Sequence, residues 1–113
     1  MLLAVAGLMG VTAAAAYADD VRPVTVDISE KTPGSYLVQW RVPRVMSPSA
    51  MPGPVLPVTC RADDRVRTEE LAAAWINRQS YECRDSLAGQ RVGIAFPVLN
   101  AAISTLVRVE LLS

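Results

Sequence analysis

Histidine is absent from this 113-residue chain. Since histidine is the commonest general base and a frequent metal ligand, its absence excludes serine triads of the usual kind. The chain also lacks the G-x-S-x-G, P-loop and G-x-G-x-x-G motifs of nucleophilic, phosphate-binding and dinucleotide-binding sites. We therefore expect no catalytic residue, no cofactor and no enzymatic activity.

An excess of charge of either sign is missing too. Eleven basic residues balance eleven acidic ones, which gives a formal net charge of zero. A neutral chain has no electrostatic footprint for nucleic acid or anionic lipid, so we expect no nucleic-acid partner. The length suits a single small domain.

Carboxylates occur as three adjacent pairs, Asp19-Asp20, Asp63-Asp64 and Glu69-Glu70. Neighbouring side chains of a strand point to opposite faces, so none of the three pairs could jointly flank one substrate bond. Carboxylates could contribute ligands for a hard cation such as calcium, but their spacing fits no EF-hand loop. We expect no metal site, and we interpret the mixed-sign stretch 61–70 as a solvated turn or strand edge rather than a binding patch.

Cysteine is scarce, with only Cys60 and Cys83. Two thiols without histidine cannot complete a tetrahedral zinc site unless carboxylates join them, and there is no C-x-x-C redox spacing. In an oxidising compartment, one Cys60–Cys83 disulfide would stabilise the fold by roughly 3 kcal/mol. We predict this structural disulfide.

The first eighteen residues, "MLLAVAGLMGVTAAAAYA", carry no charge. They end in Ala16-Tyr17-Ala18, which fits the small-x-small pattern of signal-peptide cleavage, so we predict a signal-peptide helix over 1–18 and an exported domain over 19–113. A signal peptide normally opens with basic residues, and this segment has none. A true start codon upstream, or a misassigned start, would explain their absence. An uncleaved anchor or a buried helix is the alternative, although the segment is short and alanine-rich for a membrane span.

The exported part alternates apolar and polar residues. Residues 24–28 and 36–42 have the period of two that is typical of half-buried strands, and Pro33-Gly34 between them suits a type II turn. We predict an antiparallel hairpin. Residues 43–57 contain five prolines and are expected to form a loop or edge.

Further strands are predicted at 55–60, 75–83, 91–97 and 105–111. These elements predict an all-β fold, namely a small antiparallel β-sandwich of immunoglobulin-like architecture. The cysteines lie much closer together than in antibody domains, so only the architecture is expected. Trp40 and Trp75 could form a stacking platform for a sugar or peptide, but we favour core packing. The expected core is Val26, Ile28, Val38, Trp40, Trp75, Tyr81, Ile94, Phe96, Val107 and Val109.

Five segments in order, "RPVTVDISEKTPGSYLVQWRVP", "LPVTC", a tryptophan strand ending "YEC", "SLAG" and a final "LVRVELL", resemble the N-terminal exported domain of HupE/UreJ-type bacterial membrane proteins. The resemblance covers residues 22–112. It implies a periplasmic or extracytoplasmic, membrane-associated accessory module of a nickel transport-associated protein. The family's histidine motifs lie in membrane helices that this sequence lacks, so no transport residue is carried over.

Three hypotheses follow. The first is a non-catalytic extracytoplasmic β-domain whose partner is the membrane-embedded transporter portion or another exported protein, with the present chain being a fragment or a reduced relative. The second is a free secreted or periplasmic binding protein unrelated to metal transport. The third is a small enzyme that uses Asp63, Asp64 or Glu69.

Overall fold

A computed structural model describes residues 23–97 and 104–112. These residues form two β-sheets and one short 3-10 helix, η2 (Pro48–Ala50), so the all-β prediction is confirmed. The predicted signal peptide, residues 1–18, lies outside the described residues. Within them, no helix is long and apolar enough to cross a membrane.

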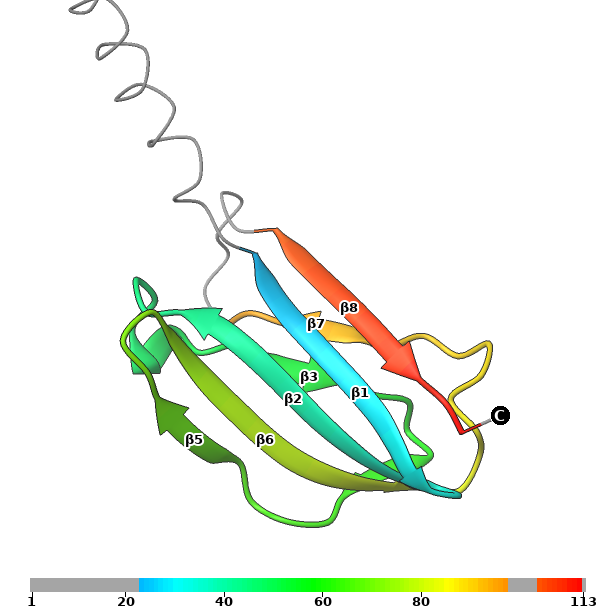
Figure 1. Ribbon diagram of the computed structural model, residues 1–113. Coiled ribbons are helices and arrows are strands. Elements are labelled where there is room, and N and C mark those ends of the chain that lie inside the picture. Colours follow the sequence, from blue (N-terminus) through cyan, green and yellow to red (C-terminus); the bar gives the residue numbers. More distant parts are fainter. Residues whose placement is uncertain (1–22, 98–103, 113) are drawn as a thin grey trace, which may run out of the picture.

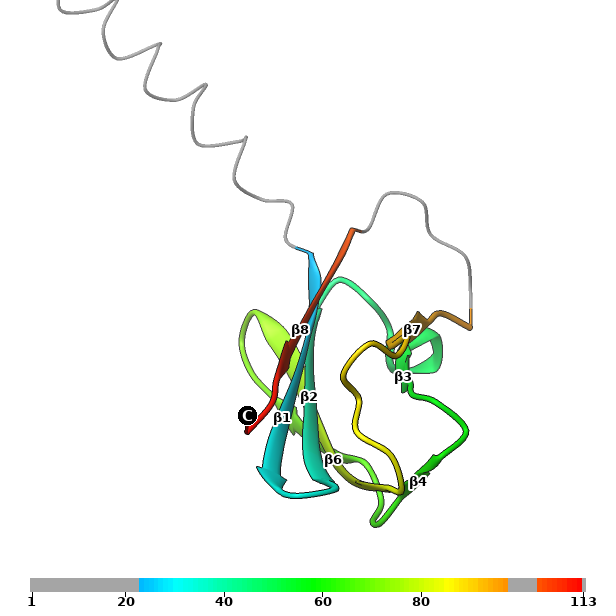
Figure 2. The ribbon, with the colours of Figure 1, turned by 90° about the vertical axis from the view of Figure 1, so that its right-hand side faces the viewer.

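The larger sheet has six strands (Figure 1). Along it lie β4, β6, β2, β1 and β8, and β5 pairs with β6 as well. The bounds are β1 (Val24–Thr32), β2 (Ser35–Pro43), β4 (Cys60–Ala62), β5 (Arg67–Glu70), β6 (Ala74–Cys83) and β8 (Thr105–Glu110). The smaller sheet pairs β3 (Gly53–Val55) with β7 (Gly93–Ala95) and lies on one side of the larger one (Figure 2).

The predicted hairpin is confirmed. β1 and β2 pair antiparallel, with Val26 opposite Trp40, around a turn in which Gly34 has a φ of +83°. Glycine accepts this conformation without the steric penalty that a Cβ atom would bring. The Gly34 carbonyl also accepts the backbone N–H of Cys83 at 2.8 Å, which fixes the turn against the end of β6.

The larger sheet is mixed rather than purely antiparallel, because β8 pairs with β1 in parallel, with Val26 opposite Val107. The expectation of an antiparallel sheet was therefore wrong at this pair. Alternation of apolar and polar residues predicts a strand but carries no information on its direction, and these two strands come from opposite ends of the described chain.

Alternation assigns the core correctly in the central strands. The inward side chains of β1 and β2 are buried: Val24, Val26, Ile28, Tyr36, Val38, Trp40 and Val42. Partly buried side chains from β6 to β8 pack against them: Trp75, Tyr81, Val92, Ile94, Phe96 and Val107. Val109 was wrongly placed in the core. It is 37% exposed, because β8 lies at an edge of the sheet where less of the chain covers it.

The predicted strand at 55–60 is interrupted. β3 ends at Val55 and β4 begins at Cys60. Pro57 lies between them and lacks the N–H that a continuous ladder requires. Its carbonyl instead accepts the N–H of Cys60 at 2.9 Å and closes a turn.

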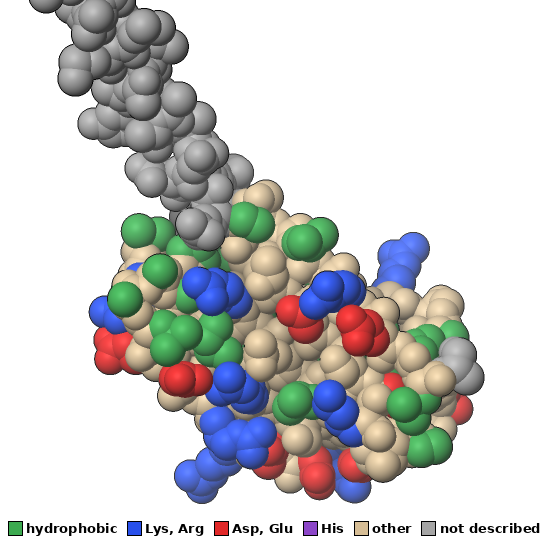
Figure 3. All heavy atoms as spheres, viewed as in Figure 1, with side chains coloured by type: hydrophobic (Ala, Val, Ile, Leu, Met, Phe, Trp, Pro, Cys, Tyr) green, Lys and Arg blue, Asp and Glu red, His purple; other side chains and the backbone are tan. Residues whose placement is uncertain are grey.

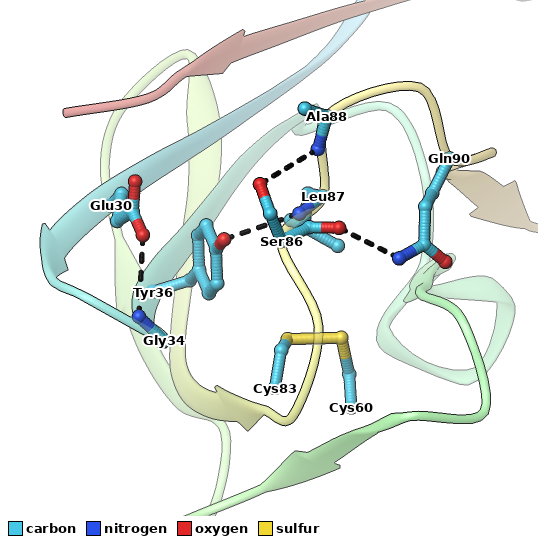
Figure 4. The surroundings of a disulfide bond; sticks show 9 residues. All are labelled: Glu30, Gly34, Tyr36, Cys60, Cys83, Ser86, Leu87, Ala88 and Gln90. Carbon is cyan, nitrogen blue, oxygen red and sulfur yellow. Dashed lines mark hydrogen bonds between the residues drawn. A yellow bond between two sulfur atoms is a disulfide. The ribbon is translucent and has the colours of Figure 1, made fainter. Parts of the chain in front are cut away.

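The Cys60–Cys83 disulfide is present and joins directly opposed residues of β4 and β6 (Figure 4). Just after Cys83 the chain turns back over the core. There Leu87 is buried, and its N–H donates to the Tyr36 hydroxyl at 3.3 Å. A disulfide of this kind is typical of proteins in oxidising compartments.

Candidate functional site

Strand β6 carries the candidate site on its inward face. Side chains two residues apart in a strand share a face, so Trp75, Asn77, Gln79 and Tyr81 form one row. A hollow of about 650 Å³ lies over this row, beside the proline-rich segment, residues 43–57. We call it the aromatic hollow. It is lined by Trp40, Pro48, Met51, Pro52, Gly53, Pro54, Val66, Thr68, Trp75, Asn77, Gln79 and Tyr81.

None of these lining residues is ionised at neutral pH. Tyr81 is the only titratable one, and burial raises its pKa above the usual value of 10.0, so the hydroxyl stays protonated. The volume lies within the range of roughly 300–1,000 Å³ that is common for ligand sites. The hollow therefore suits an uncharged ligand that has apolar surface.

Both tryptophans hold the proline-rich segment. The Trp40 indole N–H donates to the Pro52 carbonyl at 2.9 Å, and the Trp75 indole N–H donates to the Met46 carbonyl at 3.1 Å. The Arg44 guanidinium also lies 4.6 Å from the centre of the Trp75 ring, a cation–π contact. These contacts position one wall of the aromatic hollow.

Asn77 is the one buried polar side chain among the described residues, with 1% of its surface exposed. Its Oδ1 accepts the Thr68 hydroxyl at 2.7 Å. Among the described residues, its Nδ2 contacts only the Met51 sulfur, at 3.5 Å. An amide nitrogen carries two donors and a thioether is a weak acceptor, so the hydrogen bond to Met51 is the weaker of the two that Asn77 makes.

Gln79 and Tyr81 complete the polar side of the row. The Gln79 Nε2 donates to the Asp64 carbonyl at 2.9 Å, and the Tyr81 hydroxyl donates to the Gln79 Oε1 at 3.1 Å. The side-chain oxygens of Asn77 and Gln79 therefore each accept a hydrogen bond already. These bonds fix the orientation of both amides at the wall of the hollow.

The opposite face of the larger sheet is charged. Acidic and basic side chains interleave across it (Figure 3), and a smaller hollow of about 260 Å³ there contains Asp27, Lys31, Arg108 and Glu110. Arg108 donates to Asp27 at 2.8 Å on the surface. Exposed pairs of this kind contribute little stability.

The acidic residues that the sequence singled out do not gather at one site. Asp64, Glu69 and Glu70 each pair with a different arginine, at 3.3 Å to Arg67, 3.2 Å to Arg78 and 3.0 Å to Arg44. Asp63 is exposed, and Asp19-Asp20 lie outside the described residues. Within residues 23–97 and 104–112, no group of three or more His, Cys, Asp or Glu could hold a metal ion. The interpretation of 61–70 as a solvated edge agrees with the exposure of β5.

Sequence reasoning placed both tryptophans in the core. Trp40 is there, at 2% exposure, but Trp75 is only partly buried and lines the hollow. The roles of Asn77 and Gln79 were missed. A signal for them existed, because two amide residues on the inward face of a strand interrupt a row that should otherwise be apolar.

No family model, curated protein or solved structure matches this chain.

Proposed function

We propose that this chain is a non-catalytic exported β-domain of the kind found at the N-terminus of HupE/UreJ-type membrane proteins, and that it binds its partner at the aromatic hollow. The uncharged hollow beside β6 is the observation that carries this proposal. It offers uncharged, partly apolar surface, which suits binding, whereas Asp64, Glu69 and Glu70 each pair with an arginine.

Two features of the fold enter this proposal. The segments that resemble the family form β1, β2, β6 and β8, and the two cysteines are joined. We interpret the larger sheet and the β3–β7 sheet facing it as the layers of an immunoglobulin-like sandwich. The disulfide favours an oxidising location, and we place the domain on the periplasmic or extracytoplasmic face of the membrane.

Co-purification tests this function. The full chain is co-expressed with the membrane-embedded portion of a HupE/UreJ-type protein from the same genome, and the membranes are solubilised in mild detergent. We expect the domain to remain with the membrane portion.

Two matched variants locate the contact. Val66→Arg brings a charge to the rim of the aromatic hollow, whereas Leu106→Arg does so on β8, and both native side chains are exposed, by 46% and 61%. We expect Val66→Arg to abolish co-purification and Leu106→Arg to preserve it. Migration of the wild-type domain apart from the membrane portion, or with a soluble exported protein instead, would contradict the transporter-associated role.

A further inference from the structure

We propose that β8 is a dimerisation edge, at which two copies of this chain join their larger sheets by antiparallel β8–β8 pairing. The inference goes beyond the proposed binding function and is independent of it, because β1 and β2 separate β8 from the strand that carries the aromatic hollow. Three observations lead to it: an open strand edge, exposed apolar side chains along that edge, and a charge pattern that is complementary to itself.

The open edge is the outer side of β8. This strand ends the larger sheet (Figure 1), and in the part of the chain that the structure describes it pairs with β1 alone. The other edge strands of this sheet, β4 and β5, have three and four residues, whereas β8 has six. β8 contains neither proline nor lysine, two residues that commonly protect an edge from further pairing.

The backbone groups of β8 alternate between its two edges. The Ser104 carbonyl accepts the Val24 N–H at 2.9 Å. The Leu112 N–H donates to the Glu30 carboxylate at 3.0 Å. Even-numbered residues therefore direct their N–H and C=O groups toward β1, and odd-numbered residues direct theirs outward. Two copies can exchange these outward groups in an antiparallel ladder.

Exposed apolar side chains follow the same edge. Leu106, Val109 and Leu112 are 61%, 37% and 56% exposed. Alternation places the two leucines on the outward face of the sheet, and Val109 on the inward face beside Val107, which packs against the core. A second β8 would therefore cover apolar surface on both faces.

The charges of β8 select one register. In an antiparallel pair, opposed side chains share a face, and opposite charges placed there stabilise the pair. When Val109 lies opposite Val109 of the second copy, Arg108 of each copy lies opposite Glu110 of the other. Both side chains are free to meet, at 68% and 66% exposure. Arg108 donates to Asp27 through Nε, so its terminal nitrogens can reach the second copy.

The same register matches the apolar residues. It places Leu106 opposite Leu112 on the outward face, and Val107 opposite Leu111 on the inward face, where both already pack against the core. The pairing would continue the hydrophobic core from one copy into the next. It also has the two-fold symmetry of an isologous dimer.

Neighbouring registers lose this match. A pairing centred on Arg108 places two arginines opposite each other, and one centred on Glu110 does the same with two glutamates. Like charges directly opposed destabilise a strand pair. A pairing centred on Val107 places Arg108 opposite the apolar Leu106. The sequence of β8 therefore specifies how two copies align as well as that they pair.

Sedimentation equilibrium of the oxidised full chain at increasing concentration tests the dimer. The paired segments are short compared with a standard interface of about 1,600 Å², so we expect a dimer that dissociates on dilution. Arg108→Glu leaves two acidic residues on this face of β8 and Glu110→Arg leaves two basic ones, so each variant alone opposes like charges. We expect each to weaken dimerisation at least tenfold.

Mixing the two variants is the decisive step. A copy with Arg108→Glu and a copy with Glu110→Arg place opposite charges at both contacts, so the equimolar mixture should dimerise about as well as the wild type. A damaged strand would explain a loss in either variant alone, but it would not explain a gain when the same two proteins are mixed. Arg67→Glu is the matched control, because it makes the same charge change on edge strand β5, also beside an aspartate, and should dimerise as the wild type does.

A wild-type chain that stays monomeric at every concentration would overturn the proposal. So would a dimer whose affinity ignores the charges at positions 108 and 110, or a mixture that associates no better than its components. Leu106 faces the second copy in this dimer, so an adduct formed there joins two copies of the chain and not the chain to a membrane protein. Co-purification and the Val66→Arg variant test the aromatic hollow, and either proposal can fail while the other stands.

Discussion

Removal of the Cys60–Cys83 disulfide should lower the stability of the fold by an amount that can be worked out. The bond closes a loop with a sequence separation of 23. In the chain-entropy model, a loop of this length corresponds to about 3 kcal/mol of stabilisation at 25 °C. Strand β4 has only three residues and lies at the edge of the sheet, where it pairs with β6 beside the bond.

Urea unfolding of the oxidised protein, the reduced protein and a Cys60→Ala, Cys83→Ala variant measures this contribution. The buried Trp40 provides a fluorescence signal. With a slope of about 1–3 kcal/mol per molar urea, the midpoint should fall by roughly 1–3 M in both the reduced and the variant proteins. Reductant should leave the variant unchanged. A loss of less than about 1 kcal/mol would refute the reasoning, because the bond would then not restrict the unfolded chain as the chain-entropy model requires.

Three further predictions concern the sheet and its turn. Gly34→Ala should cost about 1–2 kcal/mol in urea unfolding, because the position has positive φ and the added Cβ would lie 3.2 Å from a β6 carbonyl oxygen; unchanged stability would contradict this reading. Backbone N–H groups of Leu112 and Gly34 lower the pKa of Glu30 below 4.5, so its stabilisation is present above that pH and lost as the pH falls through the lowered folded-state pKa. Acid titration should therefore destabilise the wild type more than Glu30→Gln, and parallel curves would count against the interaction. Trp40→Phe should leave the Pro52 carbonyl without its donor and cost about 1–3 kcal/mol in thermal unfolding, and a neutral result would show that water replaces the indole.

The alternation of apolar and polar residues predicted the features of the fold that depend on one strand alone. The alternation in residues 24–28 and 36–42 gave both the strands and their buried faces, and Pro33-Gly34 gave the turn, since each depends on neighbours in sequence. The parallel pairing of β8 with β1 could not be predicted this way. It depends on contacts between distant segments that leave no periodic signal.

The buried residues of the loops were not predicted either, because their burial also depends on contacts between distant segments. Met46 and Leu87 are buried although neither lies in a strand. Their side chains belong to the core cluster on the sheet. The Trp75 indole and the Tyr36 hydroxyl bind the backbone of Met46 and of Leu87. The aromatic hollow shares this origin, because it forms where the proline-rich segment meets β6.

Site-specific photo-crosslinking in the native host tests most directly whether the aromatic hollow is the contact surface. A benzophenone amino acid is placed at Val66, on the rim of the hollow, or at Leu106, on β8, both exposed in the structure. The account predicts covalent adducts to a membrane protein of the transporter type from position 66 and none from position 106. Adducts from position 106 alone would contradict it.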